Sequence, residues 1–264
     1  MYNFEYHKPK SLADAVAALK KASDGKLIAG GQTLIPTLKQ RLAQPSDLID
    51  LSGVAELRGI KVDGKTVTIG AMTKHGEVAS SAEVEKAIPA LHQMAKLIGD
   101  PQVRNLGTLG GSIANADPAA DYPAAIIALN ATIKTNERTI NADDFFKGIF
   151  TTALKEGEVI VSVSFPAPDK AAYQKFRHPA SRFALVGVFV AKSGNNVRVA
   201  VTGAGPSVFR VKAMEEALAK NWSPDAVANI KVPASGLNTD IHGGADYRAH
   251  LVTVMAKRAV ADAK

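Results

Sequence analysis

Apolar and polar positions at the start of the chain predict a helix, a strand and a second helix, in that order. Ser11 precedes the helical stripe of residues 12–21, and an acidic residue follows three positions after it, which is typical of a capped helix N-terminus. The apolar run of residues 26–29 predicts a short strand that leads directly into two glycines. Residues 34–42 again have helical spacing, with Thr33 as the expected N-cap.

The middle of the chain mixes hairpins with helices. Residues 59–69 place Asp63-Gly64 between two alternating runs, and this dipeptide is a strong signal for a hairpin turn. The remaining apolar patterns predict helices over about 78–85, 88–98 and 117–129, a second hairpin over 131–140 and a strand over 159–165.

Closely spaced prolines in residues 166–168 predict a linker, because they favour extended chain and interrupt strand pairing. The pattern beyond them predicts strands over 173–177, 185–192 and 197–202, then helices over 211–220, 224–230 and 246–261. We therefore expect an α+β fold. A two-part module would occupy residues 1–168, with subdomains of about 1–56 and 57–168, and a small C-terminal domain of antiparallel sheet and helices would occupy residues 169–264.

Composition leaves the expected fold unchanged and mainly excludes classes of function. The chain has 264 residues, 46% of them hydrophobic and 22% charged, which is ordinary for globular domains. A net charge of +7 suits an anionic ligand, but the basic residues are scattered and only 6% of residues are aromatic, so we expect no nucleic-acid binding. With no cysteine, the chain itself supplies no thiolate ligand for an iron–sulfur cluster or zinc ion. It also shows no apolar run of signal-peptide or membrane-helix length, so we expect a soluble cytoplasmic protein without membrane insertion.

Two glycine-pair loops, residues 29–36 and 105–112, carry the strongest chemical signal. Consecutive glycines let backbone N–H groups approach a pyrophosphate closely, and the small hydroxyls of Thr33, Thr108 and Ser112 can donate to phosphate oxygens. Either loop alone is more often an ordinary tight turn. The six histidines show no metal-ligand spacing, which favours structural or surface roles for them.

The stretch 102–123, which contains the second loop, resembles the flavin-binding signature of the FAD subunit, or medium chain, of molybdenum hydroxylases. The first loop resembles that family's other flavin loop, with matching order and separation. The likeness covers essentially the whole chain, including the N-terminal Phe4-Glu5-Tyr6, the segment 177–188, Gly203-Ala204-Gly205-Pro206 and the helix that begins near Asp246. It implies a two-part FAD-binding module of the PCMH type, with the flavin lying between the parts.

The resemblance implies that the two loops hold the pyrophosphate and ribityl part of FAD through main-chain N–H groups and hydroxyls. Leu109 stands where isoleucine or valine is commoner, and Ser112 where longer relatives have asparagine. Some flavoproteins of the wider superfamily attach FAD through a histidine beside the glycine pair, where this chain has Gln32, so noncovalent FAD is implied. The implied loop residues are Ala29, Gly30, Gly31, Gln32, Thr33, Leu34, Ile35, Gly107, Thr108, Leu109, Gly110, Gly111 and Ser112.

Four further residues are implied at the flavin, each with a structural alternative. Asp117 is equally explained as a helix N-cap before Pro118. Asp121, one turn further along the same expected helix, matches the family's flavin-contacting acid but could be a solvated helix acid. Ile160 matches a position whose backbone meets the flavin, and it also suits a buried strand. Phe183 matches a ring position against the isoalloxazine, with core packing as the alternative.

The function implied by the resemblance is electron transfer, with no catalytic acid or base in this chain. FAD would relay electrons from iron–sulfur clusters on a small partner subunit to an external acceptor, while a large partner would hold the molybdenum cofactor and oxidise the substrate. A dimer of such heterotrimers is implied. A self-contained FAD-dependent oxidase or reductase of the same superfamily is the alternative enzyme, and an interaction subunit that has lost FAD is a third reading.

Overall fold

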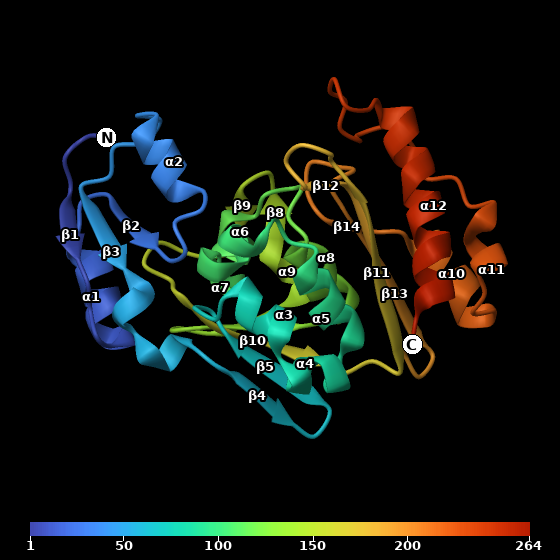
Figure 1. Ribbon diagram of the computed structural model, residues 1–264, viewed down its shortest axis with the longest axis horizontal. Helices are drawn as coiled ribbons and strands as arrows, with labels where there is room; N and C mark the ends of the chain where they lie inside the picture. Colours follow the sequence, from blue (N-terminus) through green and yellow to red (C-terminus); the bar gives the residue numbers. More distant parts are fainter.

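The computed structural model describes residues 1–264 as three units side by side (Figure 1). The N-terminal unit is a three-stranded parallel sheet in the order β1-β3-β2. Its 3-10 turns lead into the middle unit. The elements are β1 (Glu5–His7), α1 (Leu12–Lys21), β2 (Gly25–Ile28), α2 (Leu34–Lys39), β3 (Asp47–Asp50), η1 (Leu51–Gly53) and η2 (Ala55–Leu57).

The middle unit is a five-stranded antiparallel sheet in the order β4-β5-β10-β6-β7, with helices against it. A two-stranded ribbon, β8 with β9, lies beside it. The elements are β4 (Ile60–Asp63), β5 (Thr66–Gly70), α3 (His75–Ser80), α4 (Ala82–Ala87), α5 (Pro89–Lys96), α6 (Pro101–Leu106), α7 (Leu109–Asn115), α8 (Tyr122–Ala128), β6 (Thr132–Thr135), β7 (Thr139–Asn141), α9 (Ala142–Phe145), β8 (Phe146–Gly148), β9 (Thr151–Thr152) and β10 (Ile160–Pro166).

The C-terminal unit is a four-stranded antiparallel sheet in the order β11-β12-β13-β14, covered on its outer face by three helices (Figure 1). Its longest helix, α12, runs along β11 and β12. The elements are β11 (Lys170–Arg177), β12 (Ala184–Ser193), β13 (Asn196–Thr202), β14 (Phe209–Arg210), α10 (Lys212–Lys220), α11 (Pro224–Ala228) and α12 (Ala245–Asp262).

The largest core cluster is shared between the middle and C-terminal units. Tyr173, Phe189 and Ala200, all from the C-terminal sheet, pack into the same buried cluster as the helices and strands of the middle unit. The opposite face of that sheet packs on α10 to α12 in a second cluster. Because both faces are covered, β12 is buried over its first eight residues and reads as a continuous apolar run.

Sequence pattern and structure differ at several helix boundaries. The helix expected over 34–42 ends at Lys39, and Thr33 makes no side-chain capping bond. The patterns at 78–85 and 88–98 resolve into α3, α4 and α5. The helix expected from residue 117 begins only at Tyr122, because residues 117–121 are tied to the C-terminal sheet through their backbone.

Candidate functional site

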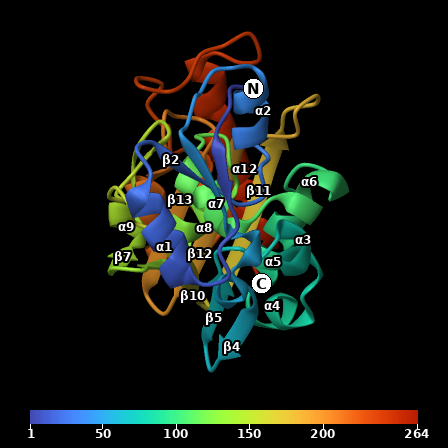
Figure 2. The same ribbon diagram turned by 90° about the vertical axis from the view of Figure 1, so that its left-hand side faces the viewer.

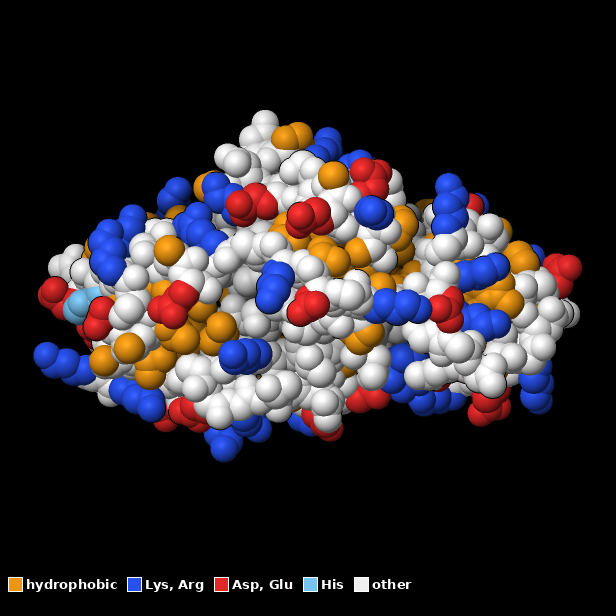
Figure 3. Space-filling model, turned by 90° about the horizontal axis from the view of Figure 1, so that it is seen from below, with side chains coloured by type: hydrophobic (Ala, Val, Ile, Leu, Met, Phe, Trp, Pro, Cys, Tyr) orange, Lys and Arg blue, Asp and Glu red, His pale blue; other side chains and the backbone are white.

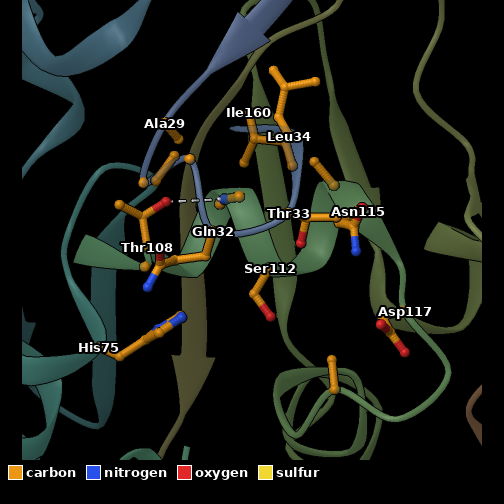
Figure 4. A pocket seen from close by; sticks show the side chains of 18 of the residues that line it. Ala29, Gln32, Thr33, Leu34, His75, Thr108, Ser112, Asn115, Asp117 and Ile160 are labelled. Atoms are coloured by element: carbon orange, nitrogen blue, oxygen red, sulfur yellow. Dashed lines mark hydrogen bonds between the residues drawn. The ribbon is translucent and has the colours of Figure 1, made fainter. Parts of the chain in front are cut away.

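A cavity of about 510 Å³ lies between the N-terminal and middle units, and one loop of the C-terminal unit contributes to its wall. Its volume is typical of cofactor and ligand sites. Both glycine pairs contribute to the lining, as do Asp117, Asp121, Ile160 and Phe183. Figure 4 shows Ala29, Leu34 and Ile160 on one side and His75 and Asp117 on the other, with Ser112 between them. Of the residues predicted for the site, all except Ile35 and Leu109 line this cavity.

The first loop presents free backbone donors to the cavity. The N–H groups of Gly30, Gly31, Gln32 and Thr33 donate to no other group of the chain, whereas Ile35 N–H donates to the Gly31 carbonyl. Gly31 has φ +72°, a conformation that glycine adopts without strain. Ile35 lies outside the cavity because its side chain packs back against Gly31. These unpaired donors suit an anionic group such as a pyrophosphate.

The second glycine pair forms the first turn of α7 and is not an open loop. Gly110 N–H donates to the Ala71 carbonyl at 2.8 Å, and Gly111 N–H donates to Thr108 Oγ1 at 3.2 Å, the bond drawn in Figure 4. Of residues 107–112, only Thr108 has an N–H group that donates to no other group of the chain, so this segment offers fewer free donors than the first. A Cβ at Gly110 would lie 2.6 Å from the Cβ of Ala71, so glycine is needed for α7 to pack there. Leu109 points into the core and is fully buried.

The two glycine segments are in direct contact, and Figure 2 views the molecule from the side of the N-terminal unit, with α7 of the middle unit behind it. A Cβ at Gly30 would lie 2.2 Å from the Leu106 carbonyl oxygen and 2.7 Å from the Cα of Gly107. Only a residue without a side chain permits this approach. The contact brings the hydroxyl-bearing Thr108 and Ser112 into the same cavity as the free N–H groups of the first loop.

Residues 117–121 form a turn that the C-terminal sheet holds in place. Thr202 Oγ1 donates to the carbonyls of Pro118 and Ala120, and Gly203 N–H donates to Pro118 at 2.7 Å. Asp117 is not a helix N-cap, since its Oδ1 accepts from Ala119 N–H within this turn. The carboxylates lining this end of the cavity are thus positioned by a unit more than eighty residues away in sequence.

We expect Thr202→Val to lower both stability and FAD affinity. Valine keeps the shape of the fully buried threonine but removes the donor of the Ala120 carbonyl, which costs about 1–3 kcal/mol, while the Pro118 carbonyl keeps its bond from Gly203 N–H. Denaturant unfolding and FAD titration measure the two effects. Thr253→Val removes a similar hydroxyl bond, to the Ile230 carbonyl away from the cavity, and should lower stability alone. Equal FAD affinity in the two variants would contradict this role of Thr202.

Asp121 is buried and does not act as a solvated helix acid. Its Oδ2 lies 2.9 Å from Lys175 Nζ, and its Oδ1 accepts from Tyr173 Oη at 2.5 Å. Burial raises the pKa of Asp121, and the Lys175 ammonium opposes that rise. Phe183 is 47% exposed, so it is not a core residue, and it follows Ser181 and Arg182 along the cavity rim.

Among the lining residues that were not predicted from the sequence, two are ionisable groups with strongly shifted pKa values. His75 is 5% exposed, its Nδ1 has no hydrogen-bond partner, and burial lowers its pKa to about 4, so it is neutral at physiological pH. The Glu158 carboxylate accepts bonds from Arg138, Thr135 and the Lys155 N–H, and these lower its pKa to about 2. No sequence motif marks either residue, because Tyr122 beside His75 and Arg138 beside Glu158 are distant from them in sequence.

Other kinds of site are not evident in the structure. No group of three or more histidine or acidic side chains could hold a metal ion. No helix combines the length and apolar composition needed to cross a bilayer. On the face seen in Figure 3, basic side chains are interspersed with acidic ones and form no continuous stripe.

Comparison with known proteins agrees with this geometry along the whole chain. Residues 2–168 match the family model of the FAD binding domain in molybdopterin dehydrogenase, and residues 171–263 match the CO dehydrogenase flavoprotein C-terminal domain. The chain therefore belongs to the family of FAD-binding medium subunits of molybdenum hydroxylases, and it is an oxidoreductase subunit of the α+β fold expected from the sequence.

Individual relatives have the same length and fold. The chain is 42% identical to the carbon monoxide dehydrogenase medium chain of Hydrogenophaga pseudoflava, over 97% of this chain and 96% of that one. It is 37% identical to the nicotine 6-hydroxylase medium subunit of Paenarthrobacter nicotinovorans, over 98% and 96%. The solved structure of the Hydrogenophaga pseudoflava carbon monoxide dehydrogenase that lacks the Mo-pyranopterin moiety superposes with a TM-score of 0.86 and 41% identity, over 98% and 96%. The prediction of FAD as cofactor is confirmed at the level of the family.

Proposed function

We propose that this chain is the electron-transfer subunit of a molybdenum hydroxylase complex. It would carry a noncovalent FAD through which electrons pass from iron–sulfur clusters of a small partner subunit to an external acceptor. A large partner subunit would hold the molybdenum cofactor and the substrate. When bound, FAD supplies the redox chemistry, and this chain binds it, orients it and sets its electrostatic surroundings.

The observation that carries this proposal is the contact between the two glycine segments. Gly30 touches the backbone of residues 106 and 107, so the free N–H groups of the first loop face the same space as the hydroxyls of Thr108 and Ser112. That donor set fits a pyrophosphate. The cavity extends to both sides of it, which fits an extended dinucleotide.

The two ends of the cavity differ in chemistry, and this supports an orientation for FAD. At one end Leu27, Leu51 and Val159 pack in one hydrophobic cluster, which suits the adenine, and Lys26 and Glu158 lie beside them. The other end contains Ile98, Val103, His75 and Asp121 and is bordered by the exposed ring of Phe183, which suits the larger and more polar isoalloxazine. Within this proposal Asp117 lies beside the isoalloxazine end, and Ile160 lies at the adenine end, opposite His75 (Figure 4).

The assembly and the domain division also belong to the proposal. Relatives are named as medium chains or as one subunit of a dehydrogenase complex, which supports partners of other sizes. We propose a dimer of heterotrimers, and an FAD module over residues 1–168 followed by a C-terminal domain over residues 169–264. The shared core implies that the two domains act as one rigid support for the cofactor.

The purified chain should take up FAD and show the visible absorption bands of oxidised flavin. A full chain that stays colourless and shows no binding in an FAD titration would overturn the proposal. Purification of a tagged chain from its own cells should also recover a cysteine-rich small subunit and a large molybdenum subunit. An isolated chain that turns over a substrate unaided would favour the self-contained enzyme.

A further inference from the structure

A buried ion pair lies directly behind the wall of the proposed isoalloxazine end. Lys175 Nζ lies 2.9 Å from Asp121 Oδ2, and the two side chains are 1% and 5% exposed. Asp121 lines the cavity, whereas Lys175 and Tyr173 stand behind it on β11. A charge in such surroundings is only weakly screened by water.

The donors around Asp121 indicate that it is a carboxylate. Tyr173 donates to one carboxyl oxygen and Lys175 to the other, and the ammonium can only donate, so it favours the ionised carboxyl. Because burial alone favours the neutral acid, the ammonium is the group that stabilises the charge. The pair as a whole therefore adds no net charge to the wall.

The surrounding sheet is built to accommodate this arrangement. Tyr173 and Lys175 alternate on one face of β11, and Gly187 is the residue opposite Lys175 on β12. A Cβ at Gly187 would lie 2.3 Å from the Tyr173 hydroxyl, so glycine leaves the space through which that hydroxyl reaches Asp121. Lys175 also donates to the Leu97 carbonyl at 3.1 Å, next to the cavity-lining Ile98. One ammonium thus holds two segments of the cavity wall.

We propose that Lys175 and Tyr173 are positioning residues that hold Asp121 as a compensated carboxylate, and that the neutrality of this pair sets the redox potential of the bound flavin. This inference rests on the proposed function and on the isoalloxazine lying at the Asp121 end. Reduction adds electrons to the ring system, so an uncompensated positive charge in the wall favours reduction and an uncompensated negative charge opposes it.

The test is a double-mutant cycle that removes each charge of the pair in turn. Each variant of the full chain is loaded with FAD, and dye-coupled reductive titration measures the flavin potential. Asp121→Asn should raise the reduced-to-oxidised ratio at a fixed potential by about tenfold, equivalent to about 30 mV for a two-electron couple. Lys175→Met should lower it at a pH high enough to keep the unpaired Asp121 ionised, because burial alone favours the neutral acid, and the double variant should return close to wild type. Lys170→Met, an exposed position on the same strand, is the matched control and should change nothing.

A merely structural pair would lower FAD affinity or stability in both single variants but leave the potential unmoved. That result, or a double variant whose potential stays clearly shifted from wild type, would overturn the inference. Lys175→Arg keeps the charge and should keep the potential. If Lys175→Met does not fold, an Asp121→Asn variant with the wild-type flavin potential is sufficient to overturn the inference. Failure of the wild-type chain to bind FAD would instead reject the proposed function, so the two failures are distinguishable.

Discussion

Gly30→Ala should weaken FAD binding by about 10- to 100-fold, because the added methyl group cannot be accommodated. Its Cβ would lie 2.2 Å from the Leu106 carbonyl oxygen, and backbone atoms cannot rotate away as a side chain would. Overpacking of this kind costs about 1–3 kcal/mol, and each 1.4 kcal/mol corresponds to tenfold in affinity. The strain is relieved when the two glycine segments move apart, which separates the free N–H groups from the Thr108 and Ser112 hydroxyls.

Fluorescence titration with FAD measures this effect, and circular dichroism verifies that the variant is folded. Gly148→Ala is the matched control, since a Cβ there meets nothing within 4 Å and the residue lies on the β8–β9 ribbon. The control should bind FAD like the wild type. A folded Gly30→Ala variant with unchanged affinity would show that the contact between the segments does not form the cofactor site.

Arg138→Met should destabilise the protein, because it removes the main partner of a buried carboxylate, although the guanidinium itself is partly exposed. The Glu158 side chain is fully buried, and Arg138 contacts both of its oxygens. Without the arginine this carboxylate is left with fewer donors in an apolar wall. Denaturant unfolding at neutral pH measures the loss, and Glu158→Gln in the Arg138→Met background should recover part of it.

The ion pair of Arg138 and Glu158 should also make the stability of the fold depend on pH, in a direction that the pKa of Glu158 determines. The folded-state pKa of Glu158, about 2, lies below the ordinary glutamate value, so the ionised form stabilises the fold at neutral pH. This contribution should be lost as the pH falls from about 4.5 toward about 2, where the carboxyl becomes protonated. Arg138→Met should show a shallower acid slope than wild type. An identical slope would mean that the arginine does not stabilise the carboxylate.

Local signals predicted much of the fold. The helix expected over 12–21 is present with Ser11 as its cap, and the hairpin expected over 59–69 forms between β4 and β5, with its turn at Gly64-Lys65, one position later than expected. Both depend on residues within a few positions of one another, so the sequence pattern contains the necessary information. The strands of the C-terminal sheet were predicted for the same reason, since long apolar runs mark a sheet buried on both faces.

The errors lie where distant segments decide the local structure. The helix expected from residue 117 is delayed to Tyr122 because Thr202 and Gly203 bind the backbone of the intervening turn. The second glycine pair becomes helical because Gly110 packs on Ala71. The partnership of Lys175 with Asp121 likewise spans 54 positions, and a lone lysine in a strand gives no sign of it.

The turn at residues 117–121 also bears on when the cofactor can enter. Its donors, Thr202 and Gly203, are made long after the first glycine loop leaves the ribosome, and β11 is fixed in turn by a bond from Ala171 N–H to the carbonyl of Lys264. N-terminal segments of a chain emerge and begin to fold first. We therefore expect flavin insertion to follow translation, so that cells short of FAD would accumulate completed, flavin-free chains.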